Sequence, residues 1–77
     1  IKAKALNVAI MPNPTQGVFH IQCSEAVKQT LIYDINGRLL KTVDNATTIN
    51  IQGFPKGIYI AKITTARGTA QRKVVVE

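Results

Sequence analysis

The residues that could do chemistry in this sequence are few, and their spacing separates them. His20 is the only histidine and Cys23 the only cysteine among 77 residues. On a β-strand their odd offset points the two side chains to opposite faces, so they do not form a nucleophile–base dyad. A metal site at His20 would need carboxylate or thiolate partners, and a single cysteine excludes a disulfide within the chain.

The acidic residues and glycines do not complete a catalytic site. Asp34 and Asp44 stand beside turn sequences, Glu77 ends the chain, and the four acids are far apart. The segment 53–57 (Gly-Phe-Pro-Lys-Gly) is not followed by helical residues, as a phosphate-binding loop would be. We therefore expect a non-catalytic domain with no metal and no cofactor.

Positive charge is the main electrostatic feature. Ten Lys and Arg face four Asp and Glu, which gives a net charge of +6. Such a balance favours anionic partners. The cations are scattered, with Arg72-Lys73 as the only adjacent pair, and this distribution is typical of an ordinary solvated surface.

Nucleic-acid binding is not expected, because it needs exposed aromatic side chains among the basic residues. Phe19, Tyr33 and Tyr59 fall on apolar faces of predicted strands, where core packing accounts for them. Only Phe54, before Pro55, stands in a loop, and one exposed aromatic residue makes a poor stacking surface.

The elements that must position these residues are strands. Turn-forming residues recur roughly every 8–12 residues, and β-branched and aromatic residues between them alternate with polar ones. No segment has the periodicity of an amphipathic helix. We predict about seven strands, over residues 5–11, 17–23, 27–34, 38–43, 47–52, 57–65 and 69–76.

Two hairpins follow from the turn residues. Asn36-Gly37 predicts a two-residue type I′ turn, because both residues tolerate positive φ. Arg67-Gly68 marks a second hairpin, between the last two predicted strands.

The strand pattern predicts an all-β fold, a compact seven-stranded antiparallel immunoglobulin-like β-sandwich. A five-stranded barrel of the oligonucleotide-binding type is the rival. Within residues 27–34, the alternation predicts that Val27, Leu31 and Tyr33 face the core. It places Lys28, Thr30 and Asp34 on the opposite, polar face.

Four segments, taken in order, carry more information than the strand pattern. They are 11–17 (Met-Pro-Asn-Pro-Thr-Gln-Gly), 32–38 (Ile-Tyr-Asp-Ile-Asn-Gly-Arg), 55–63 (Pro-Lys-Gly-Ile-Tyr-Ile-Ala-Lys-Ile) and 72–77 (Arg-Lys-Val-Val-Val-Glu). In this order and spacing they resemble the C-terminal sorting domain of type IX secretion cargo from Bacteroidetes bacteria. The resemblance covers about residues 8–77.

The resemblance implies a transport signal and no activity. Such domains look like small immunoglobulin-type sandwiches at the end of exported proteins such as proteases and adhesins. The outer-membrane translocon recognises the folded domain after periplasmic transit, and the cargo reaches the cell surface or is secreted. In many members a sortase-like peptidase removes the domain and joins the cargo to anionic lipopolysaccharide.

Carried over residue by residue, the resemblance implies translocon-recognition elements in all four segments. These are Pro12, Asn13, Pro14, Gly17, Asp34, Gly37, Arg38, Gly57, Tyr59, Lys73, Val74, Val75, Val76 and Glu77. Met11, where the family often has an aromatic residue, and Glu77, in place of a basic one, depart from the pattern. We hypothesise strand-edge or surface docking by the export machinery, with the last strand as the candidate because an unpaired edge can accept another strand.

The sequence starts at Ile1, and we interpret it as a piece of a longer protein. Residues 1–7 would be the end of a linker from an N-terminal cargo domain, with the family's cut at or before them, and residues 8–77 the sorting domain. Two alternative functions remain: a generic immunoglobulin-like binding or spacer module of an extracellular protein, and, less favoured by the aromatic residues, a basic nucleic-acid-binding barrel.

Overall fold

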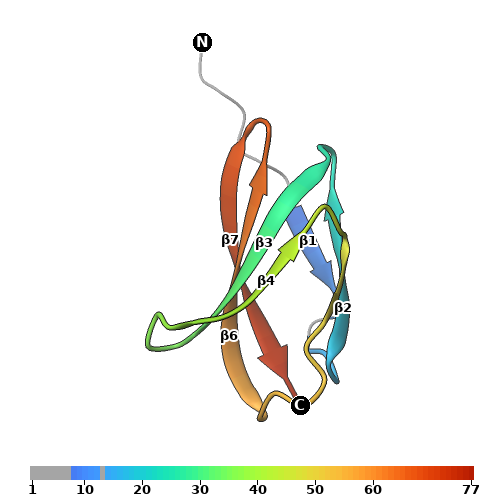
Figure 1. The fold of residues 1–77 in the computed structure, drawn as a ribbon. Coiled ribbons are helices and arrows are strands. Elements are labelled where there is room, and N and C mark those ends of the chain that lie inside the picture. Colours follow the sequence, from blue (N-terminus) through green and yellow to red (C-terminus); the bar gives the residue numbers. More distant parts are fainter. Residues whose placement is uncertain (1–7, 13) are drawn as a thin grey trace.

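Seven antiparallel strands form two sheets in the computed structural model of the chain, which describes residues 8–12 and 14–77 (Figure 1). The three-stranded sheet has the order β1-β2-β5, with β1 (Val8–Met11), β2 (Val18–Cys23) and β5 (Thr48–Asn50). The four-stranded sheet has the order β4-β3-β6-β7, with β3 (Val27–Asp34), β4 (Leu39–Asp44), β6 (Gly57–Thr65) and β7 (Gly68–Val76). The predicted all-β sandwich is confirmed, and the rival five-stranded barrel does not form.

The strand boundaries follow the predicted ones closely, with one clear exception. The strand expected over 47–52 ends at Asn50, because the Asn50 side-chain oxygen accepts a hydrogen bond from the backbone N–H of Gln52 at 2.9 Å and the chain turns there. Residues 5–7 of the first predicted strand lie outside the described residues. No helix among the described residues is long and apolar enough to cross a membrane.

The core lies between the two sheets and is built from residues two apart on each strand. Phe19 on β2 and Ile49 on β5 are fully buried from one side, and Ile63 on β6 and Val74 on β7 from the other. The period of two seen in the sequence therefore points the correct side chains inward on these four strands. Burial of such side chains is the main stabilising contribution to a domain of this size.

The inward face of β3 differs from the prediction. Val27 is buried, but further along the strand Thr30 and Ile32 are fully buried while Leu31 and Tyr33 lie on the outer face. The cause is a register shift between Val27 and Gln29 in the pairing with β6. One extra residue in a strand exchanges its two faces from that point on. Tyr33 is consequently not a core aromatic residue.

The β3–β4 turn also differs from the predicted two-residue type I′ turn. Gly37 has φ +85°, but among the described residues Asn45 is the only non-glycine with positive φ, so Asn36 does not adopt the conformation required. The backbone N–H of Gly37 donates to the carbonyl of Asp34, and the N–H of Asp34 donates to the carbonyl of Arg38, each at 3.0 Å. The loop therefore has three residues, 35–37, with glycine in the left-handed position.

Tyr59 closes the connection between the two sheets. Its hydroxyl donates a hydrogen bond to the carbonyl of Pro55, four residues upstream, and its ring packs against Phe54 with centroids 5.5 Å apart. A tyrosine near the start of this strand, bonded back to the preceding corner, is a hallmark of immunoglobulin-like sandwiches. Phe54, expected to be exposed, is instead half-buried against the core.

Thr30 gives a test of the β3 register. Its hydroxyl oxygen is buried without a hydrogen-bond partner. We expect Thr30→Val, which keeps the shape and removes the hydroxyl, to raise the free energy of unfolding by about 1 kcal/mol, as measured by urea denaturation. If Thr30 instead faced solvent, as the sequence predicted, the substitution would leave stability unchanged.

Candidate functional site

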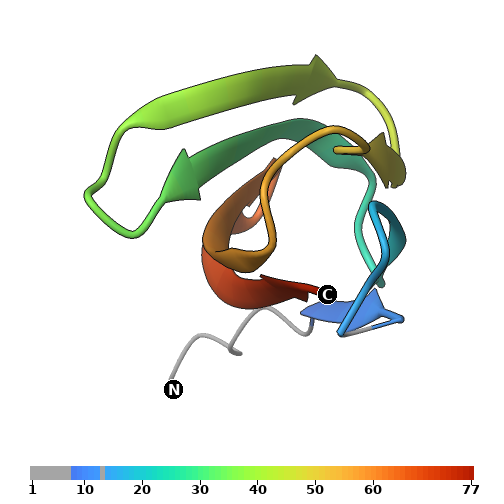
Figure 2. The same ribbon diagram turned by 90° about the horizontal axis from the view of Figure 1, so that it is seen from below.

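The predicted recognition segments converge toward one end of the sandwich. Asp34 on β3 lies opposite Tyr59 on β6, and Tyr59 lies opposite Val74 on β7. Two residues nearer that end, Val76 lies opposite Gly57 and forms an isolated parallel bridge with Thr15. In Figure 2, which views the molecule from this end, the C-terminus faces the viewer and the β3–β4 hairpin projects to one side. Residues as far apart in sequence as Thr15 and Val76 thus share one region.

The end of β7 is not the unpaired edge that the sequence suggested. The backbone N–H of Thr15 donates to the carbonyl of Val75 at 2.8 Å, and the N–H of Glu77 donates to the carbonyl of Thr15 at 2.9 Å. These bonds attach the segment after β1 to the final strand in parallel orientation. A strand docking at this point would have to displace the Thr15 segment from the end of β7.

Thr15 joins the first and last segments, a role that its position in the sequence did not predict. The residue is 1% exposed. Its hydroxyl donates to the carbonyl of Val18 at 2.8 Å and accepts the backbone N–H of Gly17 at 3.1 Å. The available signal was its place between Pro14 and Gly17, where a polar side chain can satisfy the backbone of a short irregular segment.

Gly17 allows this segment to pass close to the loop after β5. Its φ is +130°, and a Cβ there would lie 2.8 Å from the Cγ of Gln52. The carbonyl of Gly17 accepts the N–H of Ile51 at 2.6 Å. Pro12 and Pro14 line a shallow hollow of about 370 Å³ beside it, and the Met11–Pro12 peptide bond is cis. Asn13 lies outside the described residues.

Asp34 organises the β3–β4 turn through its carboxylate. One oxygen accepts the backbone N–H groups of Asn36 and Arg38, each at 2.9 Å, and the other lies 3.2 Å from the Arg38 Nε. The N–H of Arg38 is the main cause that lowers the pKa of Asp34, helped by the N–H of Asn36 and the Arg38 charge and opposed by partial desolvation. Asp34, Gly37 and Arg38 thus form one structural unit.

The remaining predicted residues divide into buried and accessible ones. Tyr59, Val74 and Val76 are buried in the core. Such side chains affect recognition through the fold, since a partner does not reach them. Lys73 and Glu77 are exposed, whereas Gly57 and Val75 are half-buried.

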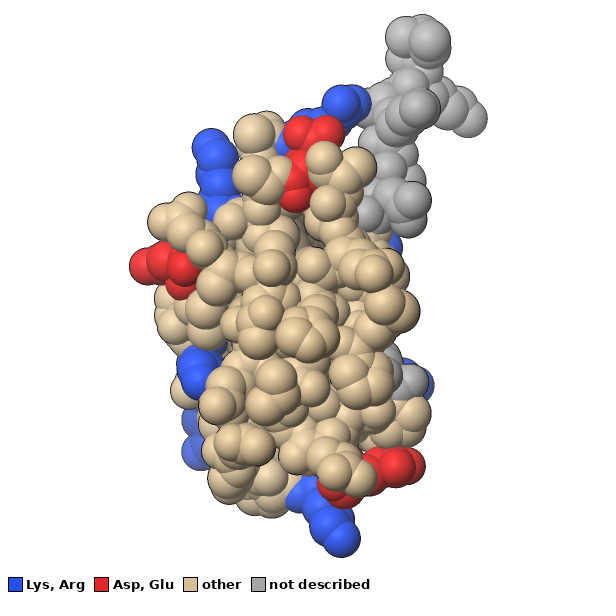
Figure 3. Space-filling model, turned by 90° about the vertical axis from the view of Figure 1, so that its right-hand side faces the viewer, with Lys and Arg blue, Asp and Glu red and all other residues tan. Residues whose placement is uncertain are grey.

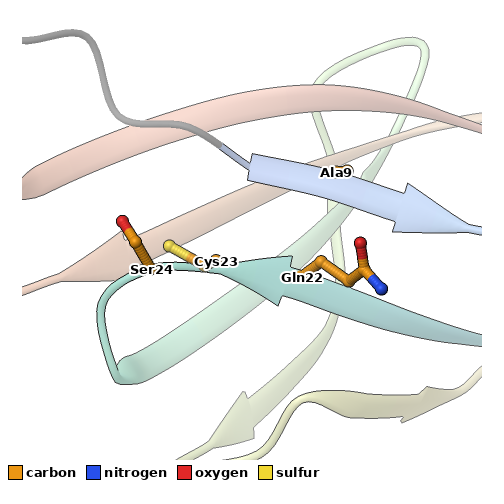
Figure 4. Close-up of a pocket in the computed structure, with 4 residues that line it drawn as sticks. All are labelled: Ala9, Gln22, Cys23 and Ser24. Atoms are coloured by element: carbon orange, nitrogen blue, oxygen red, sulfur yellow. The ribbon is translucent and has the colours of Figure 1, made fainter.

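Among the described residues, the side chains that could take part in catalysis do not come together in a reaction centre. His20 is exposed on the outer face of β2 with its Nδ1 3.0 Å from the Thr48 hydroxyl, whereas Cys23 packs partly buried against the core. A hollow of about 290 Å³ near Cys23 is lined also by Ala9, Gln22 and Ser24 (Figure 4). None of these three is a base that would activate a thiol. Among residues 8–12 and 14–77, no three His, Cys, Asp or Glu side chains group as metal ligands.

Charge is distributed unequally between the two sheets. Strands β1, β2 and β5 contain no Lys, Arg, Asp or Glu. Figure 3 views the side of the molecule on which this sheet lies, and the coloured charged side chains there lie around the margin of an uncharged surface. Strands β3, β4, β6 and β7 carry five cationic and two acidic residues. The molecule therefore presents one neutral and one cationic sheet.

The fold and the position of these residues define a class, a small immunoglobulin-like domain whose distinctive segments are built into its structure. Residues 9–77 match the family model described as the secretion system C-terminal sorting domain. The chain belongs to this family, and the resemblance to type IX sorting domains is confirmed. The search of curated proteins finds no match. Membership identifies a sorting signal that works with the type IX machinery and belongs to a protein exported to the cell surface or secreted.

Thr15→Val tests the junction between the first and last segments. This substitution removes both buried hydrogen bonds of the hydroxyl and leaves the Val18 carbonyl and the Gly17 N–H without that partner. We expect a loss of about 2 kcal/mol in the free energy of unfolding, measured by urea denaturation. Thr30→Val is the matched control, because the same chemical change there should stabilise the fold. Equal effects of the two substitutions would contradict the assignment.

The lowered pKa of Asp34 predicts acid sensitivity of the turn. Because the folded-state pKa lies below the ordinary value of 3.8, the carboxylate stabilises the folded state above that pH. The contribution is lost as the pH falls through the lowered pKa. We expect the wild type to lose more unfolding free energy than Asp34→Asn between about pH 5 and pH 2. Parallel pH profiles of the two proteins would refute this.

Proposed function

We propose that this domain directs an N-terminally attached cargo protein through the type IX outer-membrane translocon to the cell surface. Residues 1–7 connect the cargo, and residues 8–77 act as the sorting domain. The translocon reads the folded end of the sandwich where the four segments converge. After translocation a sortase-like peptidase cuts at or before residues 1–7 and joins the cargo to anionic lipopolysaccharide.

The observation that carries the proposal is the family match over residues 9–77 together with the convergence of its segments. Pairings across strands bring residues 15, 34, 57, 59, 74 and 76 toward one end. A surface that depends on all these pairings exists only in the folded domain, which supports recognition of the fold in place of a linear peptide. The exposed Arg38 guanidinium, paired with the Asp34 carboxylate, presents hydrogen-bond donors to solvent at this end.

A fusion experiment tests the proposal. A reporter with a periplasmic signal is joined to the N-terminus of the chain and expressed in a host with a working type IX translocon. We expect the reporter on the cell surface, as measured by whole-cell immunodetection. Arg38→Ala should reduce surface delivery severalfold while leaving the domain folded, because it removes an exposed charge of the recognition end.

Arg67→Ala is the matched control for the fusion experiment. Arg67 also lies in a hairpin turn and faces a carboxylate, that of Glu25 at 3.8 Å, but it stands at the opposite end of β6. We expect normal delivery of this variant. A wild-type fusion that remains in the periplasm would reject the sorting function and favour a generic binding or spacer module. Equal delivery of both variants would reject a recognition role for Arg38.

A further inference from the structure

A groove runs along the outer face of the four-stranded sheet, next to the β3–β4 turn. Tyr33 and Ile60, side by side on β3 and β6, and Ile35 of the turn give it apolar surface. Lys62, two residues along the same face of β6, lines it as well. The groove has a volume of about 340 Å³. The turn that borders it contains Asp34 and Gly37, which were already predicted as recognition residues.

The surroundings of the groove are unusually apolar for a solvent-exposed sheet. Ile35 is 72% exposed, Leu39 49% and Ile58 46%. Leu39 lies opposite Tyr33, and Ile58 lies on the same face of β6 as Ile60. Single exposed apolar residues are normal, but a contiguous patch of them marks an interaction site. The inward shift of Thr30 and Ile32 is what places Leu31 and Tyr33 on this outer face.

The electrostatics of the groove are cationic. The acidic side chain that lines the groove is Asp34, and its carboxylate is already engaged by Arg38 and by two backbone N–H groups. The Lys62 ammonium forms no ion pair with any of the residues that the structure describes. Lys73 lies opposite Ile60 on β7 and adds positive charge to the same face. A ligand that places a carboxylate next to an apolar group matches both properties.

We propose that this groove is the docking site for an apolar side chain of a translocon protein, flanked by a carboxylate that pairs with Lys62. The inference rests on the proposed function, because it specifies the translocon feature that reads the domain. The apolar side chain lies on Tyr33 and Ile60, and Ile35 covers it from the turn. Burial of the apolar group provides affinity, and the carboxylate sets specificity and orientation.

A protein partner fits the groove better than the two other occupants of suitable chemistry. A second copy of this chain carries the same net charge of +6, so two cationic faces repel each other. An anionic lipid surface is flat on this scale and does not enter a groove bordered by a turn. The concave shape instead suits one projecting side chain, as interface anchors usually are.

Binding of Lys62 variants tests the proposal. The probe is the outer-membrane translocon purified in detergent from a type IX host, immobilised and titrated with the reporter–domain fusion. We expect Lys62→Glu to weaken binding about tenfold or more and Lys62→Arg to bind within about twofold of the wild type, since it keeps the charge. Wild-type binding should weaken with added salt.

Two further variants keep the result interpretable. Lys62→Gln removes the charge with less risk to the fold than Lys62→Glu, and thermal unfolding checks that the variant is folded. We expect this variant to bind the translocon more weakly than the wild type and with a smaller salt dependence. Gln22→Glu adds the same acidic group to the exposed outer face of β2, on the neutral sheet, and should bind as the wild type does.

The outcomes separate this inference from the proposed function. If Lys62→Gln and Lys62→Glu bind the translocon as the wild type does while the wild-type fusion is still exported, the groove is not the docking site and the sorting function stands. If the wild-type fusion neither binds nor is exported, the sorting function itself is rejected. If the Lys62 variants lose affinity for vesicles of anionic lipid while their affinity for the translocon is unchanged, the groove binds the membrane and the proposal is overturned.

Discussion

The backbone pairing between Thr15 and the end of β7 is the constraint on which the architecture of this domain depends. β1 belongs to the three-stranded sheet through its pairing with β2, yet the segment that follows it bonds to Val75 of the four-stranded sheet and to Glu77 just after it. The chain thus changes sheets within a few residues and ties the two layers together at one end. The hydroxyl of Thr15 and the conformation of Gly17 make that change possible, because they satisfy and bend the backbone where no regular strand can form.

Most of the fold was predictable because strands in a thin sandwich must alternate. Phe19, Ile49, Ile63 and Val74 each follow the period of two and each is buried, since every strand has one face toward the core. The inward face of β3 was not predictable, because a register shift changes the parity without leaving a sequence signal. The prediction of a two-residue β3–β4 turn was wrong for a related reason. The Asp34 carboxylate favours a three-residue loop over the two-residue turn that is typical of Asn-Gly.

The candidate site was predictable in its membership and unpredictable in its arrangement. The four segments carry enough motif residues to indicate the family, and the family match over residues 9–77 agrees. Their meeting at one end depends on strand order, which the sequence does not state. Residues such as Tyr59 and Val76 turn out to be buried, so their presence in the motif reflects the fold more than direct contact. The groove beside Tyr33 could not be predicted from the sequence, because the alternation placed Tyr33 on the core side of β3.

The unequal charge of the two sheets has a consequence for how the molecule meets its surroundings. With no charged residue on β1, β2 and β5 and an excess of cations on the other four strands, the strand charges are polarised from the neutral sheet toward the cationic sheet. In the field near a negatively charged surface, such a molecule rotates before it collides, and its cationic layer arrives first. The neutral layer then trails toward solvent. Encounters are therefore pre-aligned, which increases the fraction of collisions that can become productive.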